Sequence, residues 1–304
     1  MVQKNRLPQH IKYKNSLNKT DFRNSRNQEI KMKCHQSILS SLLAVGLAAT
    51  TILTLTAAFP TQAATTPEEE GLAISKKAKE RDFGWQDSTA SMLMKLRNKQ
   101  GQESIREINI KSLEVANDGD KGLTIFNKPR DVKGTAFLSF SHTVGADEQW
   151  LYLPALKRVK RISSRNKSGP FMGSEFSFED LSSFEIPKYA YKYLGDEKIN
   201  GLDSFMVEQD PVDKNSGYTR RIVWIDKSEY RIQKIDFYDR KNSLLKTLTY
   251  SNYKQFLNKY WRAMTMTMVN HQNGKSTDLV WDKYKFRVGL SDKDFNKNSL
   301  KRAH

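Results

Sequence analysis

The 304-residue chain is poor in the residues that most catalytic and metal sites use. It has a single cysteine, Cys34, so the chain after that residue can form neither a disulfide framework nor a cysteine metal site. Of its five histidines, His142, His271 and His304 follow residue 63, and none has a neighbour at metal-ligand spacing. Nucleophile-elbow, phosphate-loop and zinc-protease motifs are also missing. We therefore expect a protein that is not an enzyme and needs no cofactor.

Acidic residues are outnumbered, with 34 Asp and Glu against 51 Lys and Arg, which gives a formal charge of +17. Nine basic and two acidic residues lie in the first 63 positions, so the rest of the chain carries only +10. The chain is 38% hydrophobic and 28% charged in both signs, a composition that permits a folded core. With no groove-entering helix or aromatic-basic platform evident, we expect no nucleic-acid partner.

Residues 38–58 form the one long uncharged run, and Lys31 and Lys33 precede it. Small residues follow at Thr61 and Ala63, where a signal peptidase accepts them, so cleavage is predicted after Ala63 or one residue later, at Ala64. A retained membrane anchor is the alternative, because 21 residues can span a bilayer. The run is rich in Ser, Thr and Ala and lacks a positive stop-transfer flank, which favours cleavage and export.

The predicted leader, residues 1–63, is longer than an ordinary signal peptide, and a start at Met32 would leave residues 1–31 untranslated. No cysteine follows the uncharged run, so lipid attachment at a new N-terminus is excluded. No linker or composition break divides what remains. We expect residues 64–304 to form one domain, located in the periplasm if the leader is bacterial, and to be monomeric.

Most of the predicted domain alternates apolar and polar residues with period two. Residues 90–97, 219–225 and 230–237 show this pattern, and short turn sequences such as Asn200-Gly201 separate the strands. We expect ten or eleven strands between residues 88 and 289, forming a large curved antiparallel sheet with one wet face.

Only short helical segments are expected beside these strands. Thr66, Pro67 and Glu69 form a capping signature for a helix that runs to about residue 82. The carboxylates Glu179 and Asp180 lie in a short helical turn at 177–181, which we interpret as capping rather than catalysis. A second helix is predicted after residue 291.

Methionines and large aromatic residues dominate the expected inner face. Met264, Met266 and Met268 alternate with Thr265 and Thr267, so the three methionines point to one side of a strand. Such stripes normally fill a core, and a filled barrel is one reading. Methionine also suits irregular apolar cavities, and a large sheet with few helices can leave its concave side partly open. The candidate cavity residues are Met92, Met94, Trp224, Trp261, Met264, Met266, Met268 and Trp281.

Six basic residues are concentrated within residues 157–167: Lys157, Arg158, Lys160, Arg161, Arg165 and Lys167. Charges on a sheet edge keep it from pairing with other chains, which is one explanation. The other is contact with an anionic membrane surface, a lipid headgroup or an acidic partner protein. We call these six residues the basic strip.

Several segments resemble the outer-membrane lipoprotein-sorting protein family, the LolA-like group. The resemblance lies in the runs 150–162, 168–174 and 178–181, and it continues through Ile222-Val223-Trp224-Ile225-Asp226, Phe237-Tyr238-Asp239-Arg240, Tyr260-Trp261-Arg262 and residues 268–277. It covers nearly the whole predicted domain. The resemblance implies an open β half-barrel closed by a helical lid, and a periplasmic carrier of acyl chains that works with a transporter of the resistance-nodulation-division (RND) type.

The residues and the resemblance together predict a carrier of lipid or lipoprotein acyl chains moving towards the outer membrane. Burying an acyl chain contributes roughly 0.8 kcal/mol per methylene and needs no acid-base chemistry. The alternative is a non-enzymatic soluble adaptor of an envelope transporter, which binds protein through the basic strip and has a filled barrel.

Overall fold

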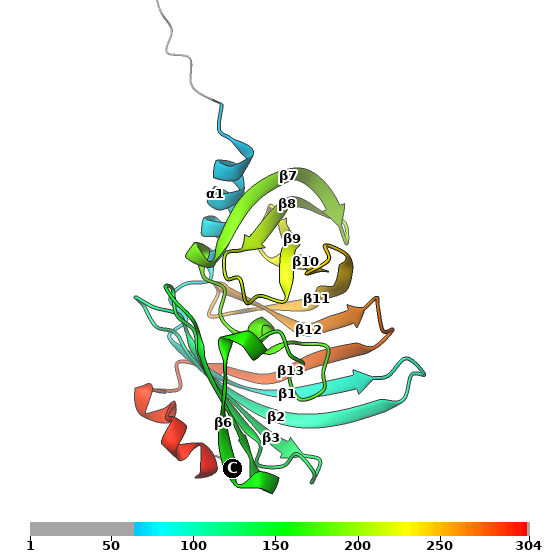
Figure 1. The fold of residues 1–304 in the computed structure, drawn as a ribbon. Coiled ribbons are helices and arrows are strands. Elements are labelled where there is room, and N and C mark those ends of the chain that lie inside the picture. Colours follow the sequence, from blue (N-terminus) through cyan, green and yellow to red (C-terminus); the bar gives the residue numbers. More distant parts are fainter. Residues whose placement is uncertain (1–63, 303–304) are drawn as a thin grey trace, which may run out of the picture. The chain divides into compact units, whose positions relative to one another are not determined.

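The computed structural model describes residues 64–302, which are dominated by β-structure (Figure 1). The one α-helix and thirteen strands of this part of the chain are α1 (Pro67–Arg81), β1 (Asp87–Arg97), β2 (Glu103–Leu113), β3 (Lys121–Lys128), β4 (Ala136–Phe140), β5 (Glu148–Leu153), β6 (Arg158–Ile162), β7 (Tyr189–Ile199), β8 (Leu202–Pro211), β9 (Tyr218–Asp226), β10 (Ile232–Asp239), β11 (Leu244–Phe256), β12 (Tyr260–Asn270) and β13 (Ser276–Phe286). Short 3-10 helices lie at Pro154–Leu156, Ser164–Asn166, Phe178–Leu181, Ile186–Lys188, Asp292–Asp294 and Lys297–Arg302.

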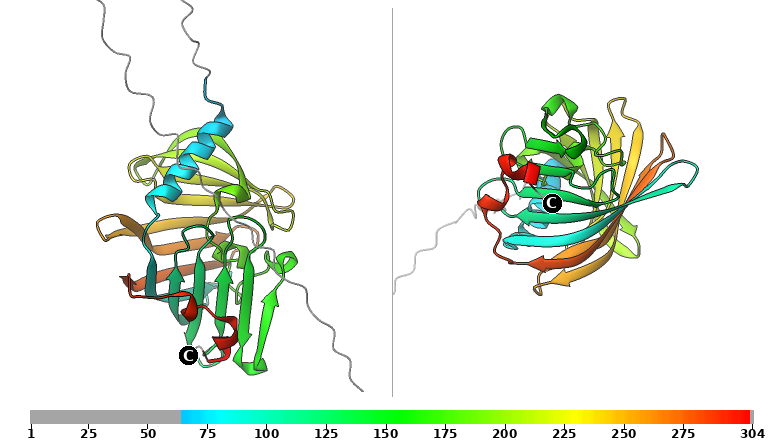
Figure 2. Two further views of the ribbon diagram at one scale, coloured as in Figure 1. Left: turned by 90° about the vertical axis from the view of Figure 1, so that its left-hand side faces the viewer. Right: turned by 90° about the horizontal axis from the view of Figure 1, so that it is seen from below.

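All these strands belong to one antiparallel sheet, in the order β6-β5-β4-β3-β2-β1-β13-β12-β11-β10-β9-β8-β7. Two meanders, β1–β6 and β7–β13, are joined side by side where β1 pairs with β13, with Met92 opposite Trp281 and Met94 opposite Leu279. The sheet curves strongly and stays open, with β6 and β7 as its edges (Figure 2). This confirms the predicted curved, open antiparallel sheet; the strand count is thirteen rather than ten or eleven.

Helix α1 begins with the predicted capping box, in which the Thr66 hydroxyl accepts from the Glu69 amide and the Glu69 carboxylate accepts from the Thr66 amide. The helix lies against β7 at unusually close range. A Cβ atom on Gly71 would lie 2.7 Å from the amide nitrogen of Tyr193 in β7, so only glycine permits this approach. The helix thereby covers the concave side of the sheet at its β7 edge.

The segment that connects the two edges, residues 163–188, crosses the concave side of the sheet; we call it the strap. Its phenylalanines Phe171, Phe176 and Phe178 are buried in the main core. The Phe171 ring lies 5.9 Å from that of Phe126 in β3 and 5.1 Å from that of Phe137 in β4, measured between centroids. The strap therefore supplies the core that the first meander needs.

Polar contacts fix the strap to the second meander. The Lys246 ammonium of β11 lies 2.7 Å from Asp180 Oδ2 and donates to the carbonyl of Glu175, and both charged side chains are almost fully buried. The Tyr218 hydroxyl donates to Asp180 Oδ1, and Glu179 accepts from the amide of Gly217. These carboxylates have structural partners, in line with the capping interpretation.

The C-terminal segment covers part of the opposite face. Phe295 and Leu300, in or beside two short 3-10 helices, form a second small core with Leu138 and Trp150 of β4 and β5. A 3-10 segment thus takes the place of the second helix expected after residue 291.

The leader prediction, including residues 38–58 and Ala63, lies outside the described residues; Ala64 is the first of them. The division at residues 63 and 64 stays a prediction. Among residues 64–302, no helix has the length and apolar character needed to cross a membrane.

Candidate functional site

A cavity of about 840 Å³ lies on the concave side of the second meander. Its lining residues on strands all come from β8–β12, and α1 and the end of the strap supply much of the remaining wall. Val223 and Ile225 of β9, Ile235 of β10 and Met266 of β12 form an apolar wall. This volume is within the range of small-molecule sites, roughly 300–1,000 Å³.

Tyrosine and tryptophan side chains extend this wall. Tyr250 and Tyr253 of β11 and Trp261 of β12 line the cavity. The Tyr253 hydroxyl donates to the carbonyl of Ile232, while the buried indole nitrogen of Trp261 has no acceptor within residues 64–302. Burial raises the pKa of Tyr250 and of Tyr253, so both hydroxyls stay neutral.

Charged residues surround the apolar wall, and most of them are paired. Four of the cavity's cations lie within 2.8 Å of a carboxylate: Lys79 with Glu185, Arg81 with Glu229, Arg231 with Asp226, and Arg262 with Asp82. The Lys259 ammonium donates to the carbonyl of Phe83. Ion pairs therefore neutralise most of the cavity's charge.

Asp120 is the exception among the carboxylates of the lining. Burial raises its pKa to about 7, and the negative charges of Glu185 and Glu114 add to this rise. Its Oδ1 accepts a long hydrogen bond of 3.4 Å from the amide of Val115. Near neutral pH this carboxyl is therefore partly protonated.

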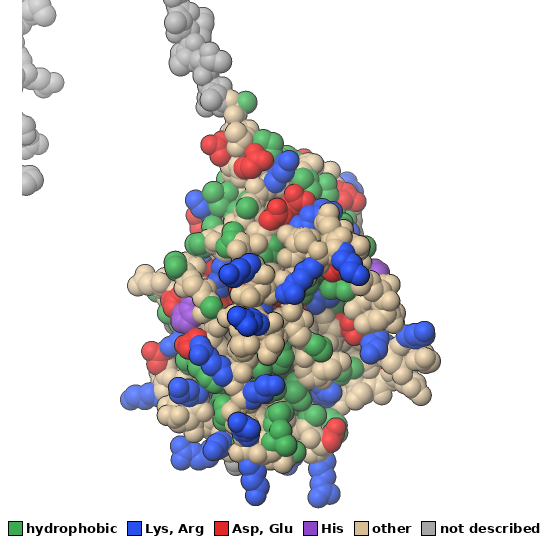
Figure 3. Space-filling model, viewed as in Figure 1, with side chains coloured by type: hydrophobic (Ala, Val, Ile, Leu, Met, Phe, Trp, Pro, Cys, Tyr) green, Lys and Arg blue, Asp and Glu red, His purple; other side chains and the backbone are tan. Residues whose placement is uncertain are grey.

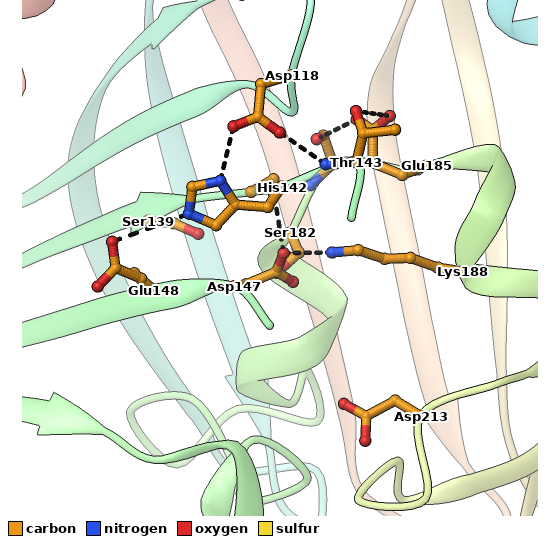
Figure 4. Close-up of polar contacts among 12 residues, drawn as sticks. Asp118, Ser139, His142, Thr143, Asp147, Glu148, Ser182, Glu185, Lys188 and Asp213 are labelled. Carbon is orange, nitrogen blue, oxygen red and sulfur yellow. Dashed lines mark hydrogen bonds and ion pairs between the residues drawn. The ribbon is translucent and has the colours of Figure 1, made fainter. Parts of the chain in front are cut away.

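A hydrogen-bonded network ties the strap to the loop between β4 and β5 (Figure 4). His142 Nδ1 lies 2.7 Å from Asp118 Oδ2, and the Thr143 amide donates to the other oxygen of Asp118 at 2.7 Å. These bonds lower the pKa of Asp118 to about 2. Asp147 accepts from the His142 amide and pairs with Lys188 at the end of the strap.

Glu185 joins the same network to α1. Its buried carboxylate accepts from Lys79 of the helix at 2.7 Å and from Ser183 of the strap at 2.9 Å. The helix, the strap and the loop between β4 and β5 therefore meet at this edge of the cavity, where Thr143 also donates to Glu185.

A family model described as an uncharacterized protein matches residues 118–302. A solved domain described as an outer membrane lipoprotein-sorting protein, from Vibrio parahaemolyticus, is 66% identical, with a TM-score of 0.76; the match covers 77% of this chain and 100% of that one. The chain belongs to the outer membrane lipoprotein-sorting protein family.

Two other solved structures are similar in fold. A DUF1329 family protein from Desulfovibrio piger is 29% identical over 78% of this chain and 100% of its own, with a TM-score of 0.74. A LolA superfamily protein from Nitrosomonas europaea has the same fold at 22% identity, with a TM-score of 0.61 over 75% of this chain and 98% of that one. A search of curated proteins found no match.

The structure does not bring the eight predicted cavity residues together. Trp261 and Met266 line the cavity. Other members of the set pack into the core that includes the strap's phenylalanines, and do not line the cavity: Met92, Met94, Met268 and Trp281. Met264 is buried but belongs to neither group.

Trp224 is on the wrong face for the predicted role. Val223 and Ile225 beside it face the cavity, whereas the Trp224 indole donates to Glu197 at 2.7 Å and the Lys234 ammonium lies 3.6 Å from its ring centroid. Ile222 and Trp224 alternate with Val223 and Ile225, so β9 is apolar on both faces. The sequence alternation could not decide which face is inner.

The basic strip lies on and beside β6, which is an edge of the sheet. Lys157, Arg158, Lys160 and Arg165 are exposed, and no ion pair links them to another residue in the described part of the chain. Arg161 lies 3.3 Å from Glu148 and Lys167 lies 2.6 Å from Asp213. Basic side chains gather on this face with few acidic ones among them (Figure 3).

Sequence reasoning missed Arg221, Tyr250 and Tyr253 in the lining. A signal for Arg221 was present, because period two puts it on the same face as Val223 and Ile225. An arginine on the inner face of an apolar strand is unusual enough to mark a site.

Proposed function

We propose that this protein is a periplasmic carrier that binds the acyl chains of lipids or lipoproteins in the cavity and hands them on towards the outer membrane. The apolar wall formed by β9–β12 carries the proposal. An acyl chain gains roughly 0.8 kcal/mol per methylene when it leaves water for such a wall. The role is one of binding and transfer, without catalysis.

The similarity to a domain described as an outer membrane lipoprotein-sorting protein supports this role. The open cavity also favours a carrier over an adaptor with a filled barrel. The unpaired part of the basic strip gives the carrier a surface for docking at an anionic membrane or at an acidic face of an RND-type transporter, which would load it.

Replacing Met266 with tryptophan tests the carrier role, because the larger ring would occupy cargo volume. We expect Met266→Trp to change the stability of the delipidated protein by less than about 1 kcal/mol, since the cavity accepts the ring. The lipid that copurifies with the wild-type protein, measured by native mass spectrometry, should be lost.

Met268→Trp is the matched control, on the same strand and face but fully buried in the core. There the larger ring overpacks, at a cost of about 1–3 kcal/mol. Wild-type protein without any bound lipid, together with a large loss of stability in Met266→Trp, would contradict the carrier proposal.

Export is a separate part of the proposal. Sequencing the N-terminus of the protein from the cell envelope should give a chain that begins at Ala64 or one residue later. A mature chain that still contains residues 38–58 would instead indicate an anchored protein.

A further inference from the structure

Two cations of the cavity wall, Arg221 and Lys259, have no carboxylate partner within residues 64–302, and Lys259 is held by the carbonyl of Phe83. Arg221 projects from β9 into the cavity, and its Nε donates to Gln209 Oε1 at 2.8 Å. That is its one hydrogen bond to residues 64–302, and no carboxylate of this range lies within ion-pair distance. A guanidinium has five N–H donors, so four are available for another group.

The surrounding side chains hold Arg221 in place. Its guanidinium carbon lies 4.1 Å from the ring centroid of Tyr189 and 5.3 Å from that of Phe184. Its acceptor Gln209 is itself buried and lies 3.4 Å from the Ser75 hydroxyl of α1. Stacking and hydrogen bonding together fix the orientation of a guanidinium and reduce the entropy that a ligand must remove.

The carboxylates of the same lining already have partners. Glu114 accepts from the amides of Gly84 and Gln86, and the others are engaged as follows: Asp82 with Arg262, Asp118 with His142, Asp180 with Lys246, Glu185 with Lys79, and Glu229 with Arg81. Asp120 remains, and burial favours its neutral form. Residues 64–302 therefore supply no counter-charge for Arg221.

We propose that Arg221 binds an oxyanion at the end of an acyl chain, so that the cargo is an anionic amphiphile carrying a carboxylate or a phosphate. A half-buried cation is stabilised by an opposite charge, and arginine matches both oxyanions with two parallel hydrogen bonds. The apolar wall that begins at Val223, two residues along β9, takes the chain. This inference rests on the proposed carrier function and narrows it, because an acylated molecule whose headgroup has neither a carboxylate nor a phosphate has no charge to offer Arg221.

Three probes with the same sixteen-carbon chain test whether Arg221 binds a carboxylate, a phosphate or neither. They are palmitate, palmitoyl lysophosphatidic acid and the neutral monopalmitoylglycerol. Calorimetric titration of the delipidated wild-type protein should show tighter binding of at least one anionic probe than of the neutral one, by about tenfold. Tenfold corresponds to about 1.4 kcal/mol, which is the scale of one charge-assisted hydrogen bond. The stronger of the two anionic probes identifies the headgroup.

Arg221→Gln should remove that preference and leave binding of monopalmitoylglycerol unchanged. Arg221→Lys keeps the charge but loses the planar fork, so its preference should be intermediate. Arg220→Gln is the matched control, because Arg220 is the neighbouring arginine of β9 but lies outside the lining and pairs with Glu208; it should keep the wild-type preference.

A stability measurement excludes a merely structural role for Arg221. Without ligand, Arg221→Gln should be at least as stable as the wild type, because it removes a cation that has no carboxylate partner. With the anionic probe added, the wild type should gain more in melting temperature than the variant.

Equal affinity of wild type for neutral and anionic probes, or an unchanged preference in Arg221→Gln, would overturn the assignment of Arg221 while leaving the carrier function intact. If none of the three probes binds the wild type, both the assignment and the carrier function fail.

Discussion

The two meanders of the sheet both have apolar concave faces, but the strap covers one of them and the other lines a cavity. On β1–β6 the strap fills the concave side with phenylalanine side chains, as where Phe171 meets Phe137. On β8–β12 the strap contributes only Asp180 and its end, residues 182–187, and a cavity remains. The strand residues alone therefore do not decide whether a concave face is packed or leaves a cavity. The side chains that the connecting segment places against that face decide it.

The strap can pack its phenylalanines against the first meander because polar contacts fix it to the second. Its two ends join β6 and β7, the opposite edges of the sheet, and Lys246 of β11 holds its middle through Asp180. Glu185 and Lys188 hold its end to α1 and to the loop between β4 and β5. Changes to these anchors and to each face test whether the two meanders differ as described.

The largest effect is expected from removing the strap's buried anchor. Lys246→Met leaves Asp180 buried without its cation, which should destabilise the protein by about 3–5 kcal/mol in a denaturant titration. Lys227→Met, which removes the partner of Asp196 in an exposed pair, serves as the control and should cost less than about 1 kcal/mol. Similar losses in the two variants would show that the strap is not a separately anchored element.

Truncation of one side chain on each concave side compares the two faces directly. Phe171→Ala removes a buried ring from the filled side and should cost about 3–5 kcal/mol. Met266→Ala enlarges a space that is already open, so we expect a cost below about 1.5 kcal/mol, close to the transfer of the lost atoms alone. Chemical denaturation of both variants without lipid measures the difference, and equal costs would mean that the second face is packed as well.

Asp120 gives a pH dependence that belongs to the cavity. Because its pKa is raised to about 7 from an ordinary 3.8, the folded protein holds a proton that the unfolded chain releases, and stability should fall as the pH rises from about 4 to about 7. Asp120→Asn should be more stable than the wild type at pH 8, by on the order of 1 kcal/mol, and should show a flatter profile over this interval. Thermal melting across pH checks both.

Asp118→Asn should change the pH dependence of stability in the opposite direction. The pKa of Asp118 is lowered to about 2, so its contribution to stability is present above about pH 4 and is lost as the pH falls towards 2.

The Asp120 prediction has a clear contradicting outcome. If Asp120→Asn kept the wild-type pH profile, the carboxyl of Asp120 would have to be ionised and solvated in the folded protein.

The smallest effect on stability is expected from the basic strip, which lies at the β6 edge of the sheet and belongs to neither of the two concave regions. Reversing Lys157, Arg158, Lys160 and Arg161 to glutamate should leave the melting temperature and lipid content nearly unchanged. Binding to anionic vesicles should weaken, most clearly at low salt, since charges at physiological ionic strength act over roughly 8 Å. Vesicle binding that stays the same at low salt would leave protection of the β6 edge as the role of these charges.

Period-two patterns predicted the antiparallel sheet because each strand has at least one face buried, and the family resemblance implied its open form. They could not separate the two concave regions. Met94 and Met266 have the same residue type and face the same side, yet Met94 is in the core and Met266 lines the cavity. The strap decides between them, and its path depends on contacts between segments far apart in sequence, such as Lys246 with Asp180.

The candidate site was predictable in its chemistry and less so in its members. Trp224 was misplaced because β9 is apolar on both faces, which removes the alternation on which the prediction relied. Arg221 could have been found from the same strand as a charge at an inner position. Its lack of a carboxylate partner, however, is visible only in three dimensions.

The pairing of β1 with β13 has a consequence for how the chain folds. Ser88 lies opposite Phe286, so the strands that come first and last in the chain meet at the centre of the sheet. Their contact spans almost the whole described sequence. Until β13 has been synthesised, the meander β1–β6 has an unpaired edge at β1, next to the apolar side chains of Met92 and Met94. Contacts of such long sequence separation form slowly and leave strand edges open to wrong partners. We therefore expect folding to be limited by the arrival of the last strand, and a chain that ends before β13 to aggregate rather than form half of the sheet.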